Sequence, residues 1–191
     1  TVNMKKLNPV SFERWSYPPN FEPRNFFGHL KSEDGRMVQV KVIAGLSSES
    51  SPSGEYGVYL YCNKRLIERG LKSYDVGFIT GLAGKPHPSV SLTRVIVELT
   101  GQAQSMPWNS SKSALNPNHP VFVSLRTFLI GVVKEFASLS RRLEGNWQDA
   151  VLPYNSGDMV DQEIFDFPTA ARSYLPELPK SKPRFADLMK Q

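Results

Sequence analysis

Apolar residues recur every three or four positions between 121 and 143, a spacing that places their side chains on one face of an α-helix. Pro120 suits the first turn of such a helix, where no backbone N–H is needed, and Asn118 is a candidate N-cap. The face is broad, so it must pack against another element. Its members are Val121, Phe122, Leu125, Phe128, Leu129, Val132, Val133, Phe136, Leu139 and Leu143.

Two segments before the midpoint of the chain have the patterns of β-strands. Valines occupy every second position between Met37 and Ala44, which predicts a half-buried strand. The preceding Asp34-Gly35 is a hairpin signal, so 28–31 should pair with this strand. The unbroken apolar run 56–62 predicts a strand buried on both faces.

Further strands are expected between this run and the helix. The alternation of 94–99 predicts the last strand, and 71–82 is another candidate, with a short helix expected at 66–71. The pattern therefore predicts an α+β domain with a mixed sheet of four or five strands and helices packed on one face.

Prolines concentrate toward the two ends of the chain and predict extended arms there. We expect 1–30 to be an arm or linker from a preceding domain, 31–155 to be the folded domain, and 156–191 to be a C-terminal linker or arm. Aromatic residues are spaced among the N-terminal prolines, so this arm is expected to dock on the domain's own surface or on a preceding domain.

Composition narrows the classes of function. A net charge of +5 permits binding to nucleic acid or to anionic ligands without requiring it. The single cysteine, Cys62, rules out an intrachain disulfide and is typical of a cytoplasmic protein. No apolar run is long enough to span a bilayer, so we expect no membrane partner. We also find no zinc-ligand spacing and no nucleophile elbow, and expect no metal site.

A polar loop carrying one cation, Lys112, precedes the helix. Pro107 and Pro117 bracket it, and Asn109, Ser110 and Ser111 lead up to the lysine. A lysine in a polar loop is ordinarily solvated, so the loop alone does not define a site. The glycine-rich segment 81–88 also holds a lysine, but it lacks the spacing of a phosphate-binding loop.

The lysine loop resembles a loop in the second, or transducer, domain of the GHKL-type ATPases, which include DNA gyrase B, Hsp90, MutL and MORC. Hsp90-like chains have a proline, a small polar run and a basic residue in this order. The segment 61–67, which includes Asn63 and Arg65, resembles the strand-Asn-Arg-Leu-Ile segment of MutL and MORC transducers. The resemblance covers roughly 38–143.

This resemblance implies a ribosomal S5 domain 2-like fold and a role in ATP hydrolysis by a larger machine. Lys112 would contact the terminal phosphate of ATP, supported by Asn109, Ser110 and Ser111. Asn63 and Arg65 would shape an interdomain face. ATP and Mg²⁺ would be bound mainly by the protein's own N-terminal ATPase domain, whose motifs are absent from this chain. A full-length homodimer is implied.

Two other functions remain open from the sequence. A basic S5-like module could bind nucleic acid through Lys112, Arg126, Arg141 and Arg142, the last two lying at the end of the helix. Their simpler role is a favourable interaction with the helix dipole. A structural interaction domain is the third possibility, and it would be favoured if Lys112 formed an internal ion pair.

Overall fold

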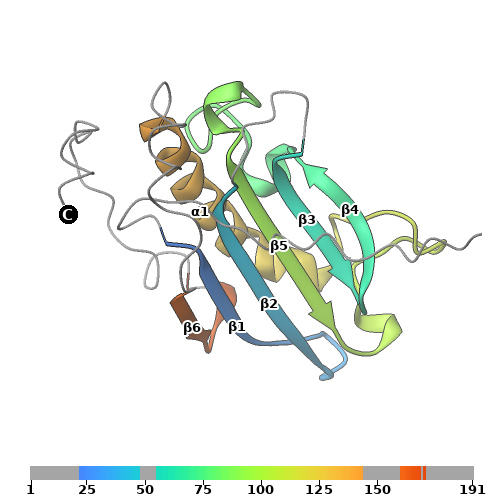
Figure 1. Cartoon of the computed structure of the whole chain (residues 1–191). Helices are drawn as coiled ribbons and strands as arrows, with labels where there is room; N and C mark the ends of the chain where they lie inside the picture. Colours follow the sequence, from blue (N-terminus) through green and yellow to red (C-terminus); the bar gives the residue numbers. More distant parts are fainter. Residues whose placement is uncertain (1–21, 48–54, 144–159, 169, 171–191) are drawn as a thin grey trace, which may run out of the picture.

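A six-stranded mixed sheet with one long helix against one face is the framework of the part that the computed structural model describes, residues 22–47, 55–143, 160–168 and 170 (Figure 1). The strand order is β4-β3-β5-β2-β1-β6. The elements are β1 (Arg24–Lys31), β2 (Met37–Leu46), β3 (Gly57–Cys62), β4 (Arg65–Leu71), β5 (Thr93–Thr100), α1 (Pro120–Arg142) and β6 (Val160–Ile164). The α+β class and the mixed sheet are thereby confirmed.

Two tight hairpins build much of the sheet. The β1–β2 hairpin turns at Gly35, whose φ is 80°, and pairs Leu30 with Val38 as the Asp-Gly signal predicts. The β3–β4 hairpin turns at Asn63 and Lys64, whose φ values are 49° and 67°. Positive φ at both central residues is typical of a type I′ turn, and asparagine tolerates this conformation well.

The centre of the sheet is buried, as the sequence predicts for 56–62. Every residue of β3 is buried. This strand pairs antiparallel with β4 and parallel with β5. The parallel pair needs a crossover, and residues 72–92, which we call the crossover connection, supply it between β4 and β5.

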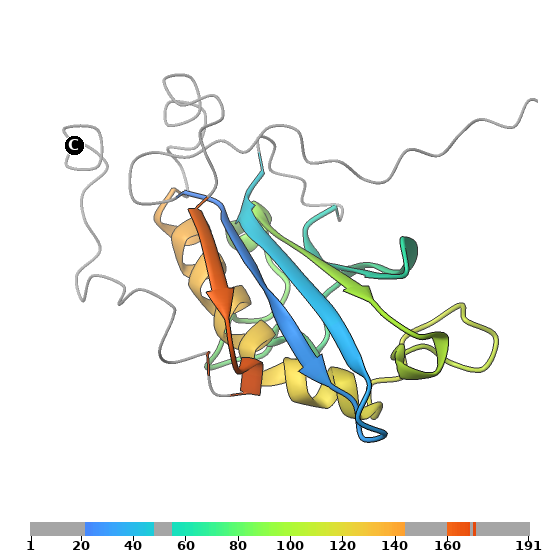
Figure 2. The same cartoon turned by 90° about the horizontal axis from the view of Figure 1, so that it is seen from below.

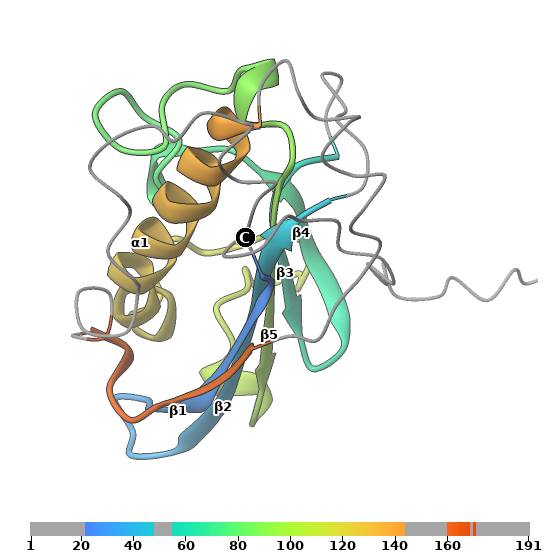
Figure 3. The ribbon, with the colours of Figure 1, turned by 60° about the vertical axis from the view of Figure 1, so that its left-hand side comes forward.

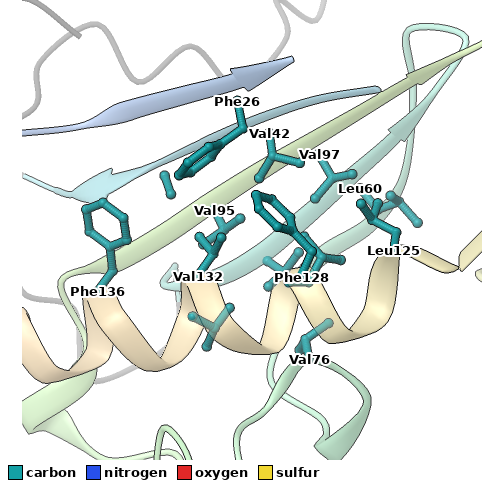
Figure 4. Packing of buried hydrophobic residues seen from close by; sticks show 14 of the residues in the cluster. Phe26, Val42, Leu60, Val76, Val95, Val97, Leu125, Phe128, Val132 and Phe136 are labelled. Atoms are coloured by element: carbon teal, nitrogen blue, oxygen red, sulfur yellow. The ribbon is translucent and has the colours of Figure 1, made fainter. Parts of the chain in front are cut away.

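The apolar face of α1 packs on the sheet, as Figure 3 shows with the helix to one side of the strands. Phe128 is fully buried at the centre of this core, and its ring meets Phe26 of β1 edge-on with a centroid separation of 5.1 Å. Phe167, after β6, packs edge-on against the same ring at 5.2 Å. Valines of β2 and β5 complete the layer between helix and sheet (Figure 4).

The sheet is larger than the four or five strands expected, because β6, from the segment assigned to the C-terminal arm, adds a strand beside β1. Strand β1 begins inside the segment 1–30, and β6 lies inside 156–191. Figure 2 shows β6 beside β1 at one edge, where the two pair in parallel from Arg24 with Val160 to Gly28 with Ile164. Gly28 is required there, because a Cβ would lie 2.2 Å from the carbonyl oxygen of Ile164.

Two local predictions were wrong. Residues 66–71, expected as a short helix, belong to edge strand β4, because the Asn63 turn folds them back onto β3. Residues 71–82 do not form the expected strand. Instead the chain turns repeatedly there, with a short 3₁₀ helix at Tyr74–Val76 and φ values of 92° at both Gly77 and Gly81.

The start of α1 also differs from its prediction. The N-cap is His119 rather than Asn118, and its Nδ1 accepts a hydrogen bond from the N–H of Val121 at 3.3 Å. Pro120 occupies the first turn as expected. No helix among the described residues has both the length and the apolar character needed to cross a bilayer.

Candidate functional site

The lysine loop, residues 107–117, is a closed structure rather than an open coil. Trp108 and Leu115 form an isolated antiparallel bridge at its base. The N–H of Asn116 donates to the carbonyl oxygen of Pro107 at 2.9 Å, and that of Asn109 donates to Ala114 at 2.9 Å. Trp108 and Leu115 also pack against the hydrophobic core, so the base of the loop is fixed to the domain while its tip projects.

Asn109 organises the tip. Its Oδ1 accepts hydrogen bonds from the N–H of Ser113 at 2.9 Å, from the N–H of Ala114 at 3.3 Å and from Oγ of Ser111 at 3.1 Å. The N–H of Lys112 donates to the carbonyl oxygen of Asn109 at 2.9 Å. Ser110 is exposed beside this network. One asparagine side chain therefore holds the backbone on the far side of the turn.

Lys112 lies at the exposed tip of the loop with a φ of 54°. This left-handed conformation costs a non-glycine residue about 1 kcal/mol, and such strain persists only where the surroundings impose it. None of the ion pairs found within the described ranges includes Lys112. Its Nζ instead lies 5.2 Å from the ring centroid of Trp108, within range of a cation–π contact.

Glu68 ties the loop to the edge of the sheet. It lies on β4, is partly buried, and its Oε1 accepts the N–H of Leu115 at 3.0 Å. Leu115 is 47 residues away in sequence and forms half of the bridge at the base of the loop. The carboxylate of Glu68 therefore supplies a hydrogen-bond acceptor for a backbone N–H in the base of the loop.

Arg126 ties the other end of the loop to α1. Its Nη2 donates to the carbonyl oxygen of Pro117 at 2.5 Å and lies 3.2 Å from Oδ1 of Asp75. Asp75 is buried in the crossover connection. This arginine therefore joins the lysine loop, the helix and the crossover connection through a single guanidinium group.

The structure places Asn63 and Arg65 at the end of the sheet where the lysine loop begins. The side chain of Asn63 forms two hydrogen bonds with Gly101, donating to its carbonyl oxygen at 2.9 Å and accepting its N–H at 3.0 Å. Gly101 follows directly after β5, so Asn63 joins the β3–β4 turn to the segment leading into the loop. Arg65 is exposed at the start of β4.

Arg141 and Arg142 lie far from Lys112, at the other end of α1. A helix of 23 residues is about 34 Å long, and the lysine loop adjoins its first turn. Arg141 donates to the carbonyl oxygen of Ala83 in the crossover connection. Burial lowers the pKa of Arg142. The basic residues considered for nucleic-acid binding are therefore separated along the helix. Two of them, Arg126 and Arg141, make contacts within the domain.

Two further chemically reactive side chains, Cys62 and His119, have structural roles. Cys62 is fully buried, and burial raises the pKa of its thiol to about 12, so it is not a nucleophile at neutral pH. His119 acts as the N-cap of α1. Within the described ranges, no three His, Cys, Asp or Glu side chains gather as they would around a metal ion.

Nothing in the sequence identifies Glu68, Asp75 or Trp108 as part of this site. Glu68 and Asp75 contact residues that are distant in sequence, and Trp108 forms a bridge across the loop. Contacts of these kinds leave no local pattern in the sequence. The only local signal for the two acidic residues is a neighbouring apolar residue, Ile67 before Glu68 and Val76 after Asp75. Comparisons of the sequence with models of known protein families and with curated proteins gave no match.

Proposed function

We propose that this chain is the transducer part, with an S5-like fold, of a GHKL-type ATPase. In the complete protein, Lys112 would contact the terminal phosphate of ATP and couple its hydrolysis to movement of a larger, dimeric machine. One observation carries the proposal. The loop holds a single exposed lysine at its tip in a strained left-handed conformation, and the backbone around it is fixed by Asn109.

The geometry suits recognition of a phosphate. A lysine ammonium is a compact charge on a long stem, and a fixed backbone lets it reach a defined position without ordering the loop anew. The neighbouring Ser110 is exposed and could donate a hydrogen bond to a phosphate oxygen, while Ser111 donates its O–H to Asn109 and so supports the loop. Stabilising charge that develops on a transferred phosphoryl group is the usual task of such a cation.

ATP and Mg²⁺ belong mainly to the preceding ATPase domain in this proposal. Asn63 and Arg65 would lie on the face that meets that domain, at the end of the sheet where the lysine loop begins. In this proposal the preceding domain binds the nucleotide, and this chain supplies one cation and the loop that holds it.

ATP turnover by the full-length protein tests the proposal. We expect Lys112→Ala to lower kcat about a hundredfold or more while ATP binding is retained, because a charge-stabilising group is lost without loss of the nucleotide pocket. Lys134→Ala removes an exposed lysine from α1 and is the matched control. Turnover of Lys112→Ala equal to that of Lys134→Ala would contradict the proposal.

A further inference from the structure

Glu68 occupies an irregular place in edge strand β4. The pairing of β3 with β4 shifts register on both sides of it, between the pairs Val58–Leu71 and Leu60–Glu68, and again before Tyr61–Leu66. Such bulges bend a strand and redirect side chains. The ladder is therefore interrupted at the residue whose carboxylate reaches the lysine loop.

The contact that Glu68 makes acts on the base of the loop. Its acceptor, Oε1, receives the N–H of Leu115, and Leu115 bridges to Trp108 on the opposite side of the loop. The ring of Trp108 lies under Nζ of Lys112 at 5.2 Å from the ring centroid. A continuous set of contacts thus runs from β4 through the loop base to the lysine.

We propose that Glu68 is a positioning residue for Lys112, acting through Leu115 and Trp108. This inference rests on the proposed function for its effect on turnover, but not for its effect on the position of the lysine. Glu68 does not touch the nucleotide. It sets the angle at which the loop leaves the domain and thereby where the ammonium group lies.

The role depends on the acceptor atom more than on the charge. Glu68→Gln keeps an oxygen at the same distance along the side chain and can still accept the N–H of Leu115. Glu68→Asp keeps the charge but shortens the side chain by one methylene, and Glu68→Ala removes the acceptor. If positioning is the role, Glu68→Gln should behave like the wild type, and the other two variants should not.

Nuclear magnetic resonance of the 191-residue chain tests the positioning directly. The ring of Trp108 should shift the side-chain methylene signals of Lys112 upfield. We expect Glu68→Ala and Glu68→Asp to reduce that shift by about half and to speed hydrogen exchange at the Leu115 amide about tenfold, since an amide protected by one hydrogen bond loses that protection. Glu68→Gln and the exposed-site control Glu98→Ala should match the wild type.

Two results would overturn the inference. One is an unchanged Lys112 shift in Glu68→Ala and Glu68→Asp. The other is an altered shift in Glu98→Ala of the same size, which would show a general loosening of the sheet. Because Glu68 is only partly buried on an edge strand, the folded state should survive each substitution.

Turnover by the full-length protein then separates the two proposals. We expect Glu68→Ala to lower kcat between about tenfold and a hundredfold with KM unchanged, and Glu68→Gln to restore it, because misplacing a catalytic group acts on the transition state. If Lys112→Ala leaves turnover unchanged, the proposed function fails while the resonance data still decide the role of Glu68. Loss of turnover in Lys112→Ala, with Glu68→Ala fully active, overturns the positioning role alone.

Discussion

The crossover connection and the lysine loop look alike in sequence but are held in different ways. Both are long connections that contain prolines and an exposed lysine, Lys85 in one and Lys112 in the other. The crossover connection buries apolar side chains, among them Val76 and Phe78, and α1 binds its backbone. Two of these bonds come from Ser140, which donates to the carbonyl oxygen of Ser89 at 2.8 Å, and from Arg141, which donates to Ala83.

The lysine loop instead satisfies its tip internally through Asn109 and meets the domain only at its base. The difference shows that the presence of a lysine in a polar loop says little about function. The useful signal is whether apolar residues are interspersed among the polar ones. Apolar side chains become buried and hold the backbone of their segment against the core. Lys85 belongs to a connection that packs against α1, whereas Lys112 lies at the exposed tip of a loop that is bridged at its base.

The largest expected effect comes from removing the apolar anchor of the crossover connection. Phe78 is 4 % exposed, and its ring packs edge-on against Tyr56 at 6.1 Å. Phe78→Ala should lower the free energy of unfolding by about 3–5 kcal/mol through lost burial and a cavity. Lys112→Ala should change it by less than about 0.5 kcal/mol, as surface substitutions usually do. Urea denaturation measures the free energy of unfolding of both variants. Equal losses would show that the crossover connection is no more firmly anchored in the core than the lysine loop.

The next effect concerns the second half of α1, which holds the crossover connection. Glu135 is buried there, with Oε1 at 3.5 Å from Nη2 of Arg24. Burial raises the pKa of Glu135 from 4.5 to about 7, and Arg24 offsets only part of that rise. The folded state then holds this proton more tightly than the unfolded chain does. The resulting stability is complete below about pH 4.5 and is lost as pH rises toward 7.

We therefore expect the free energy of unfolding to fall by on the order of 2–3 kcal/mol between about pH 5 and pH 8, beyond the general trend of the protein. Glu135→Gln should flatten this part of the profile, because an amide does not titrate. Denaturation at several pH values checks both statements. If the free energy of unfolding of the wild type fell with pH no more steeply than that of Glu135→Gln, ionisation of the buried Glu135 would not destabilise the fold.

The smallest effect compares Ser140, the α1 serine that holds the crossover connection, with Ser110 at the tip of the lysine loop. Ser140→Ala removes a hydrogen bond and leaves the carbonyl oxygen of Ser89 without that donor, so it should cost about 1 kcal/mol. Ser110→Ala alters an exposed hydroxyl at the loop tip and should cost less than about 0.5 kcal/mol. Thermal unfolding would resolve the pair. A larger loss for Ser110 than for Ser140 would reverse the assignment of the two regions.

Local pattern was enough to predict the centre of the fold. The alternating valines of β2, the unbroken apolar β3 and the helical spacing of α1 each reflect burial, which a sequence records directly. The edge strands were missed because they are less buried and their sequences carry a weaker pattern. Strand β4 is largely polar and charged, as exposed edges tend to be, and its Leu-Ile-Glu-Arg sequence is equally compatible with a helix.

Strand β6 and the anchors of the lysine loop depend on long-range pairing. The polar segment Val160–Ile164 pairs with β1, far earlier in the chain, and the side chains of Asn25 and Asp161 are joined by a 2.8 Å hydrogen bond. The exposure of Lys112 followed from the polarity of its loop. The contact of Glu68 with Leu115 could not be foreseen, because nothing in either local sequence marks the other as its partner.

The parallel pairing of β1 with β6 also has a mechanical consequence. The chain enters β1 at Arg24 and leaves β6 at Ile164, so entry and exit lie at opposite ends of one ladder. Tension applied across these two points would load the hydrogen bonds of that ladder together, in shear, rather than one after another. The edge of this sheet is therefore arranged to transmit a pull along the strands without peeling apart.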